Sequence, residues 1–301
     1  MKLFIICTYL CLQAFIMQAQ FLWDAGIKTG ASNYLGDIGG NESTRRNFVA
    51  DMKLGKTGFS SGAFGRYRIL RNVSILMEYN YGRVSGDDKL SSNLGRKYRN
   101  LNFRNDIQEL SCQAQYCFYS LDDLGHAMAY ENTFKCYIGA GVACFYHNPE
   151  TFYEGNWIDL RPLKTEGEAK PYSKFCMAIP ASLGCYVTLK RVYRIGWDIC
   201  WRTTFTDYID DISGRYASPD VLKNPLAIAL ANRTAELNPT PAISANYTPG
   251  NKRGDPTHND SYIFSTFNFS YVIRGKWFRR GLASHGRIKR YGRKKKFRVK
   301  F

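Results

Sequence analysis

Residues 105–119 alternate between apolar and polar side chains with a period of two. Leu110, Cys112 and Ala114 fall on one side of this pattern, and glutamate, serine and glutamine residues lie between them. Such alternation is typical of a β-strand with one apolar and one polar face. The same period recurs in 191–206 and in 73–81. The pattern therefore predicts long amphipathic strands, although a water-soluble sandwich of two sheets would show it as well.

Eight segments have strand character, and their connections alternate in length. The segments lie near 21–32, 59–69, 71–84, 103–119, 132–147, 173–188, 191–207 and 261–274. Several exceed the ~5 to 6 residues usual in globular sheets. Odd-numbered connections are long and even-numbered ones are shorter, as in outer-membrane barrels with long outer loops, tight periplasmic turns and both termini inside. We therefore expect an all-β protein, an eight-stranded antiparallel up-and-down transmembrane β-barrel with long extracellular loops and a periplasmic C-terminal tail.

The N-terminus has the features of a secretory signal peptide. Lys2 supplies a basic start, 3–17 is mostly apolar, and Ala19 offers a plausible cleavage point. Beyond it no apolar run approaches the ~18 residues of a membrane helix, whereas a transmembrane strand needs only about 10. We expect a signal peptide at 1–19, an outer-membrane β-barrel at 20–275 and a basic periplasmic tail at 276–301, in the bacterial outer membrane.

The polar faces of the expected strands carry charges of both signs. Eight strands enclose a space that side chains can fill, and opposite charges there would pair in a packed core. This disfavours a wide diffusion pore, although some charges would also suit a narrow path. Pro180 removes a ladder hydrogen bond, so we expect a β-bulge there. The residues assigned to the interior are Asp24, Lys28, Arg66, Arg68, Glu78, Glu109, Lys135, Arg194, Asp198 and Arg202.

Most of the excess positive charge lies at the C-terminus. The chain has 42 basic and 25 acidic residues, a net charge of +17. The segment 276–301 holds 12 of the basic residues and no acidic one, so the rest has 30 basic residues against 25 acidic ones. In the periplasm this tail would bind anionic outer-membrane lipid or an acidic protein. Nucleic acid is a poor partner for an exported chain.

The last six residues add a second feature to this tail. Phe297, Val299 and Phe301 alternate with basic residues, as in a short strand that adds to the edge of a partner's sheet. A solvated tail without a partner, the simpler interpretation, needs no such alternation. The residues assigned to partner binding are Lys276, Trp277, Phe278, Arg279, Arg280, Arg290, Tyr291, Arg293, Lys294, Lys295, Lys296, Phe297, Val299 and Phe301.

Sequence signals for catalysis are weak. None of the histidines is paired in sequence with a plausible nucleophile or metal partner, and a barrel lipase or acyltransferase would need a serine and histidine together. We therefore expect no catalytic residue and no cofactor. The histidines are His126, His147, His258 and His285.

Metal sites and disulfides are not indicated either. Asp207, Asp210, Asp211 and Asp220 would bind calcium at most loosely, and solvated loop carboxylates are the simpler interpretation. The seven cysteines after the signal peptide are odd in number and lack CxxC spacing. They favour neither a disulfide framework nor a zinc site, and we expect them to be small apolar strand residues.

Several stretches together resemble a known family. They are SNYLGD at 32–37, RNLNFR at 99–104, TFTDYIDDISG at 204–214, STF at 265–267, GKWFRR at 275–280 and RYGRKK at 290–295. They are similar to PorG, the small outer-membrane β-barrel component of the type IX secretion system of Bacteroidetes. The resemblance implies a role in protein secretion without chemistry of its own. The barrel would tie a periplasmic ring of the PorK lipoprotein and PorN to the outer membrane.

Two other classes of function stay open. One is a small structural or adhesion barrel of the OmpA or OmpX type, whose working surface would be the loops at 33–58, 148–172 and 208–260. The other is a barrel enzyme that acts on lipids. Loss of the tail would impair an anchor, whereas an adhesion barrel should tolerate it. A lipid-release assay would detect a barrel enzyme.

Overall fold

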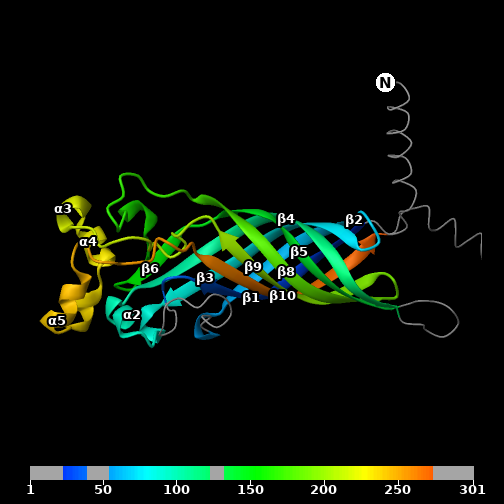
Figure 1. The fold of residues 1–301 in the computed structure, drawn as a ribbon, viewed down its shortest axis with the longest axis horizontal. Coiled ribbons are helices and arrows are strands. Elements are labelled where there is room, and N and C mark those ends of the chain that lie inside the picture. Colours follow the sequence, from blue (N-terminus) through cyan, green and yellow to red (C-terminus); the bar gives the residue numbers. More distant parts are fainter. Residues whose placement is uncertain (1–22, 39–53, 123–131, 274–301) are drawn as a thin grey trace, which may run out of the picture.

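Eight long strands close into a single antiparallel barrel. The computed structural model describes residues 23–38, 54–122 and 132–273 (Figure 1). The strands pair in the order β3-β2-β1-β10-β9-β8-β5-β4, and β4 also pairs with β3, which closes the sheet. The expected eight-stranded antiparallel up-and-down barrel is confirmed. Its strands are β1 (Trp23–Leu35), β2 (Gly58–Arg68), β3 (Val73–Asp87), β4 (Asn102–Asp122), β5 (Thr133–Tyr146), β8 (Phe175–Leu189), β9 (Tyr193–Thr204) and β10 (Ser261–Ile273).

The period of two places polar side chains inside the barrel and apolar side chains outside. Ile27, Leu110 and Phe267 point outward and are 66%, 60% and 66% exposed. Their strand neighbours Lys28 and Glu109 point inward and are buried. This is the reverse of a water-soluble protein, whose apolar residues are mostly inside.

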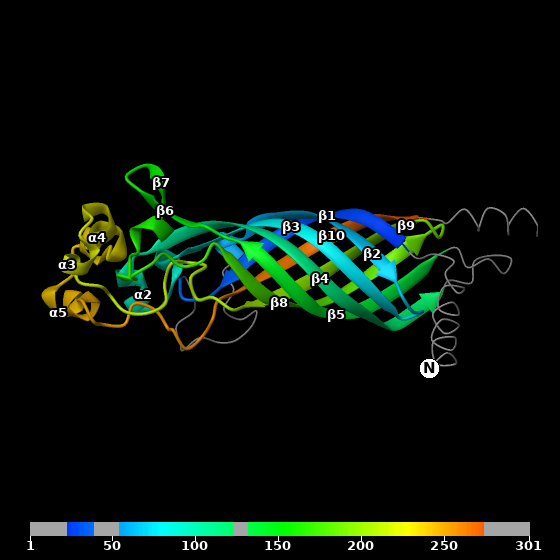
Figure 2. The ribbon, with the colours of Figure 1, turned by 90° about the horizontal axis from the view of Figure 1, so that it is seen from above.

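The connections differ between the two ends of the barrel. At one end the connections at 69–72 and 190–192 are short turns, and the start of β1 lies beside the end of β10, because Trp23 pairs with Ile273. At the other end lie the long connections 88–101, 147–174 and 205–260 and the described parts of the connection 36–57. Figure 2 shows this asymmetry, with the helices gathered beyond one end of the strands. The described parts of these long connections are called the cap below.

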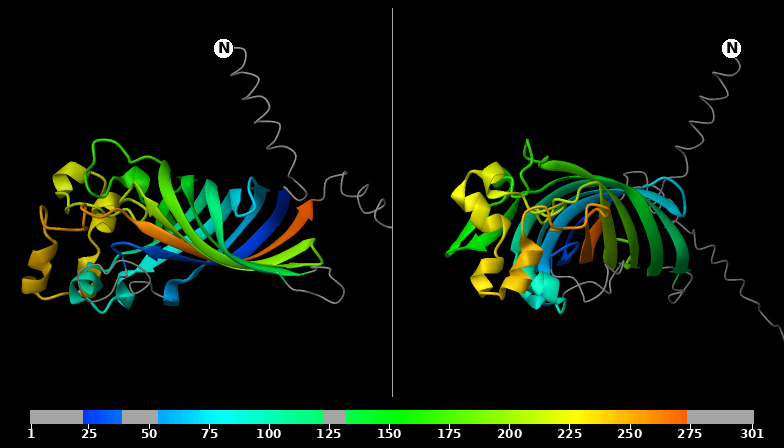
Figure 3. Two further views of the ribbon diagram at one scale, coloured as in Figure 1. Left: turned by 45° about the vertical axis from the view of Figure 1, so that its right-hand side comes forward. Right: turned by 60° about the vertical axis from the view of Figure 1, so that its left-hand side comes forward.

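The cap is folded, which the sequence analysis did not anticipate. It contains the hairpin β6 (Pro149–Tyr153) and β7 (Asn156–Asp159), which extends the barrel wall because β6 pairs with the start of β4. Figure 3 shows the short helices grouped at the same end. They are α2 (Leu94–Arg99), α3 (Pro219–Leu222), α4 (Pro225–Ala231) and α5 (Pro241–Ser244), with the 3-10 helices η2 (Leu54–Lys56), η3 (Asp88–Leu90), η4 (Arg161–Leu163), η5 (Thr234–Leu237) and η6 (Ala245–Tyr247).

In the described part of the chain, no helix has the length and apolarity needed to cross a membrane.

Ion pairs cross the barrel interior. Arg202 on β9 contacts Glu109 on β4 with an Nε to Oε2 distance of 2.9 Å, although β8 and β5 lie between these strands in the sheet. Tyr262 donates to the same Glu109 carboxylate at 2.7 Å. Lys28 on β1 contacts Glu78 on β3 at 2.8 Å. Because these groups meet across the lumen, the interior at this level is filled by side chains.

A second interior cluster lies closer to the turn end. Arg194 contacts Asp24 at 2.7 Å, and Arg66 approaches the other oxygen of the same carboxylate at 3.5 Å. Eight of the ten charged residues assigned to the interior are buried, whereas Arg68 and Lys135 are half-buried. The expected packed polar interior is therefore confirmed for these eight.

Two expectations about the strands were wrong. Cys136 on β5 and Cys185 on β8 form a disulfide, which their direct cross-strand pairing allows and which cysteine spacing along the chain does not reveal. Pro180 causes no bulge, because the β5–β8 register is the same on both sides of it, and only the ladder is interrupted. The register shift lies instead in β4, between Cys117 and Tyr119.

The cross-lumen pair gives a test of the interior. Arg202→Met leaves the buried Glu109 carboxylate without its main cation, which should lower the free energy of unfolding by about 3–5 kcal/mol. The exposed pair of Arg83 and Asp106 is a matched control, and Arg83→Met should cost about 1 kcal/mol or less. Denaturant unfolding of the two variants in lipid vesicles measures the difference. Equal losses would show that the interior is hydrated.

Candidate functional site at the barrel mouth

The segment 205–216 turns back into the mouth of the barrel, the end that the cap covers. Ile209 and Ile212 from this segment are fully buried. They pack in an apolar cluster with Phe103, Phe145 and Phe264, whose side chains point inward from β4, β5 and β10. The apolar side chains of the segment thus plug the mouth above the charged interior.

A tyrosine between two aspartates holds this plug. The Tyr34 hydroxyl at the end of β1 lies 2.6 Å from Asp210 Oδ2 and 2.6 Å from Asp260 Oδ1. Asp210 also accepts the backbone N–H groups of Ile38 at 3.1 Å and Ile212 at 3.0 Å. Asp260 Oδ2 accepts the N–H of Ile209 at 3.0 Å. The two carboxyl groups therefore fix the backbone of the plug to the first strand.

This geometry requires a shared proton. The Tyr34 oxygen already accepts the N–H of Asp37 at 3.0 Å, and its single O–H can donate to only one carboxylate. The second carboxyl group, at the same short distance, must then carry a proton and donate it to the tyrosine. Asp260 suits this role, because its Oδ1 contacts Tyr34 while both oxygens of Asp210 accept backbone N–H groups.

Burial accounts for the proton. Burial, with the nearby Asp37 carboxylate, raises the pKa of Asp210 from 3.8 to about 7, against the opposing effects of the Tyr34 hydrogen bond and of Arg99. Burial raises the pKa of Asp260 well above its ordinary value, with further contributions from Asp210 and Asp207. At neutral pH the pair therefore holds at least one proton. We call Tyr34, Asp210 and Asp260 the latch.

Gly36 leaves room for the latch. A Cβ atom at this position would overlap the Tyr34 hydroxyl and the Asp260 carboxyl group. Only glycine therefore lets the chain after β1 pass this close to them.

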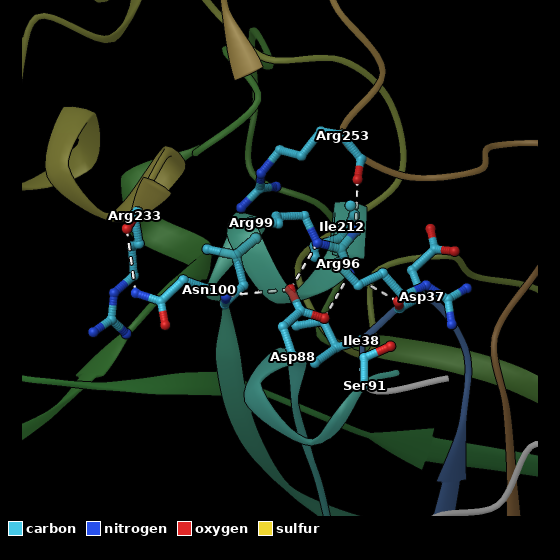
Figure 4. A network of polar contacts seen from close by, with 12 residues as sticks. Asp37, Ile38, Asp88, Ser91, Arg96, Arg99, Asn100, Ile212, Arg233 and Arg253 are labelled. Carbon is cyan, nitrogen blue, oxygen red and sulfur yellow. Dashed lines mark hydrogen bonds and ion pairs between the residues drawn. The ribbon is translucent and has the colours of Figure 1, made fainter. Parts of the chain in front are cut away.

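Arg99 joins three of the cap connections (Figure 4). Its guanidinium contacts Asp88 at 2.7 Å and donates to the backbone carbonyls of Asp37 at 2.8 Å and Arg253 at 2.6 Å. Asn100 follows in the left-handed conformation, with φ of 58°, and donates to the carbonyl of Arg233 at 3.2 Å. These two residues tie the connection 88–101 to the first and last long connections.

Arg253 ties the remaining long connection to the plug. Its Nη1 lies 3.0 Å from Glu166 Oε1 and donates to the carbonyl of Asp211 at 2.7 Å. The Asp211 carboxyl group accepts hydrogen bonds from Thr165 and from Tyr172, the latter at 2.8 Å. Burial raises the pKa of Asp211 to about 7, although Arg253 acts in the opposite direction. All four long connections are therefore fastened to one another by buried polar contacts.

The sequence-based interpretation of the aspartates was wrong in part. Asp210 and Asp211 are buried in separate hydrogen-bond networks instead of being solvated, whereas Asp220 is exposed. Among the residues that the structure describes, no group of three or more His, Cys, Asp or Glu side chains is arranged to hold a metal ion. Neighbouring aspartates in the sequence diverge because successive side chains leave the backbone in different directions.

His147 has the surroundings of a structural residue. It is fully buried, its Nε2 lies 3.0 Å from the Ser173 carbonyl, and Cys176 Sγ lies 3.5 Å from the same nitrogen. Burial lowers the pKa of His147 to about 4, so the ring is neutral and is a weak base at neutral pH. Its geometry does not support activation of the thiol.

The predicted partner-binding residues at 276–301 lie outside the described residues, as do the signal peptide and His126. The structure instead brings together three of the stretches used for the family resemblance. Tyr34 comes from 32–37, Arg99 and Asn100 from 99–104, and Asp210 from 204–214. The family resemblance of these stretches is the sequence feature that could have indicated this site. Arg253 and Asp260 had no signal of their own, because each is an isolated charge in a long connection.

The latch makes the cap sensitive to pH. Since the folded protein holds the shared proton more tightly than the unfolded chain, the stabilisation is complete below about pH 4, near the ordinary aspartate pKa. It is lost as the pH rises through about 7, the pKa of Asp210. Hydrogen exchange at the Ile209 and Ile212 amides, corrected for intrinsic rates, should show protection that falls by tenfold or more over this range, since each pKa unit corresponds to ~1.4 kcal/mol.

Asp260→Asn provides the control for the latch, because an amide can donate to Tyr34 without a titrating proton. We expect the protection in this variant to fall less than in the wild type between pH 4 and 8, because Asp210 is then the one carboxyl group of the pair that still titrates. Tyr34→Phe should weaken protection at every pH by leaving the two carboxyl groups face to face. A wild-type profile that is flat with pH would contradict the shared proton.

Comparisons with known proteins give a family and a set of similar folds. Residues 1–224 match the family described as "Domain of unknown function (DUF6089)". No curated protein matches the sequence. Solved structures that are similar include Neisserial surface protein A, with 10% identity, coverage of 84% of this chain and 97% of that chain, and a TM-score of 0.38. The outer membrane protein OprG of Pseudomonas aeruginosa has 11% identity, coverage of 86% and 99%, and a TM-score of 0.37. The N-terminal barrel domain of OprF from the same organism has 8% identity, coverage of 83% and 97%, and a TM-score of 0.31. The family match spans well over half of the chain, and the protein therefore belongs to the DUF6089 family.

Proposed function

We propose that this protein is a non-enzymatic β-barrel of the bacterial outer membrane that acts as an anchor and does not conduct solutes. The apolar outer surface of the barrel carries the membrane part of this proposal. On β8 every outward position from Phe175 to Val187 is apolar. This run spans about 40 Å of strand at ~3.3 Å per residue. With a strand tilt of about 40°, it covers about 30 Å, close to the thickness of the hydrocarbon core.

The closed interior favours a role as an anchor rather than as a channel. The pair of Arg202 and Glu109 crosses the lumen, and the cluster around Ile209 and Ile212 closes the mouth above it. Solute passage would require both to open. A rigid barrel of this kind fixes what is attached to its ends in the membrane.

Membrane insertion and closure can be tested together. The full-length protein refolded into vesicles should migrate as a compact species on a gel unless it is boiled. In planar bilayers it should give no steady conductance, because charged side chains fill the lumen. Recovery as a soluble monomer would refute the membrane proposal, and a stable open conductance would refute the anchor.

The finer proposal is that the anchor serves type IX secretion. It rests on the resemblance to PorG, and three of the stretches that carry the resemblance meet at the mouth. In this proposal the tail at 276–301 reaches periplasmic ring proteins similar to PorK and PorN. Its 12 basic residues would attract an acidic partner surface, and its alternating end would add a strand to the partner's sheet.

Removal of 281–301 tests this docking. The truncation keeps all eight barrel strands but deletes nine of the 12 tail cations and the alternating end. It should release the ring proteins from the outer membrane and reduce secretion, while barrel insertion stays normal. Lys294, Lys295 and Lys296 changed together to Glu should weaken docking at low salt more than at high salt, because exposed charges are screened. Normal secretion with unchanged co-purified proteins would refute docking through the tail.

The folded cap favours a second candidate, a structural or adhesion barrel of the OmpA or OmpX type. Buried contacts such as Arg253 with Glu166 give the cap a fixed shape, which a binding surface outside the cell requires. Such a protein would tolerate loss of the tail and would lose function when the cap is loosened. The truncation therefore separates the two candidates.

A further inference from the structure

A groove of about 440 Å³ lies on the cap end of the barrel wall, outside the plug and the latch. The ends of β3 and β4 form its floor, η2 and η3 contribute lysines, and the hairpin β6–β7 contributes aromatic rings. Its volume is in the range of sites for small organic ligands. The residues that matter for binding are Lys56, Arg83, Lys89, Arg104, Phe152 and Trp157.

Two arginines in the groove are held in fixed orientations. Arg83 binds Asp106 directly across the strand pair through Nε at 2.6 Å and Nη2 at 2.7 Å. Arg104 contacts a single oxygen of Glu150, Oε2, through Nε and Nη2 at 2.7 Å each, and its Cζ lies 3.8 Å from the centre of the Trp157 ring. In each ion pair the Nε and Nη2 edge of the guanidinium faces the carboxylate, so Nη1 lies on the opposite side of the group.

The charge of the groove favours an anion. Lys56, Arg83, Lys89 and Arg104 supply four positive charges, and Asp87 is the carboxylate among the lining residues. Asp87, Asp106 and Glu150 pair with Lys56, Arg83 and Arg104, so the cations exceed the carboxylates by one. An arginine beside an aromatic ring suits a phosphate attached to a sugar, because the guanidinium binds the phosphate and the ring packs on the sugar.

The position of the groove identifies the source of this ligand. Along the outer face of β3 and β4, the pairs Met77 with Cys112 and Tyr79 with Leu110 belong to the apolar surface. Tyr81 with Gln108 comes next, and the charged pair of Arg83 and Asp106 follows at the edge of the groove. A lipid whose acyl chains lie on the apolar pairs would therefore place its headgroup against Arg83.

We propose that this groove binds the phosphorylated sugar headgroup of a glycolipid in the outer leaflet of the membrane. The proposal rests on the proposed insertion of the barrel into the outer membrane. Arg83 and Arg104 donate to the phosphate through Nη1, Lys56 and Lys89 add positive charge, and Trp157 packs against the sugar. The acyl chains lie along the apolar outer face of β3 and β4.

Titration with bisphosphorylated lipid A tests the proposal. The full-length protein in detergent micelles is titrated with lipid A and with the same lipid after removal of both phosphates, and the bound lipid is measured by native mass spectrometry. We expect at least tenfold tighter binding of the phosphorylated form. Arg83→Gln combined with Arg104→Gln should remove this preference. Both side chains lie at the surface, so the fold should persist.

Lys252→Gln is the matched control, because Lys252 forms an exposed ion pair with Asp255 in the cap, away from the groove. It should bind lipid A like the wild type. Trp157→Ala should weaken binding of lipid A with all groove cations retained. Equal binding of the two lipid forms, or unchanged binding by the double variant, would overturn the proposal.

Two further measurements separate the possible failures. Glucosamine 1-phosphate should not displace lipid A at equal concentration, and displacement would assign the groove to a soluble sugar phosphate and overturn the glycolipid. Insertion into phosphatidylcholine vesicles is scored separately by heat-modifiable migration. Failure to insert refutes the outer-membrane proposal, whereas normal insertion with unselective lipid binding refutes the groove alone.

Discussion

A charge inside a closed barrel has little water around it and must be neutralised by another side chain. The Arg202 and Glu109 pair meets this requirement across the lumen, and Lys28 with Glu78 and Arg194 with Asp24 repeat it at other places in the interior. Removing either member of such a pair leaves a buried charge, which is far more costly than losing an exposed pair. The interior is consequently fixed by mutual pairing, and the lumen is filled as a result.

At the mouth of the barrel, buried carboxyl groups are neutralised by protons as well as by cations. Arg99 and Arg253 neutralise the carboxylates of Asp88 and Glu166. Asp210 and Asp260 instead face each other across Tyr34. Burial makes the state with one carboxyl group protonated lower in free energy than the state with both ionised. The cap is thus an ordered, buried structure that rests on the barrel. This arrangement gives the protein two distinct ends, with a fastened cap at one and the short turns at the other.

The outer surface of the strands has the opposite polarity from the interior. Apolar side chains cover the strands, and polar side chains begin again near Arg83 and Asp106, where β3 and β4 extend toward the cap. In the proposed function, anchoring would use the apolar surface and recognition would use the polar rim and cap, so the two roles would be physically separate.

The strands, their two faces and the inward placement of most of the charges could be predicted from the order of residues alone. A period of two is a local property of the chain. It can be recognised from neighbouring residues such as Leu110 and Glu109 without knowing which strands pair with them. The unequal lengths of the connections likewise indicated the up-and-down order. The folded state of the cap could not be predicted from the sequence, because its helices are short and are held by contacts between distant segments.

Which buried groups meet depends on the closed fold. Arg202 finds Glu109 and Cys136 finds Cys185 because closure of the sheet and its register bring them together. Asp210 and Asp211 are the same residue type at neighbouring positions, yet one accepts a hydrogen bond from Tyr34 and the other accepts hydrogen bonds from Thr165 and Tyr172. The free energy of a buried polar group depends on its partners, and those partners can lie far away in the chain, as Tyr34 and Asp260 do at a separation of 226 residues. A local pattern therefore specifies that a side chain points inward, and the closed fold specifies what it meets there.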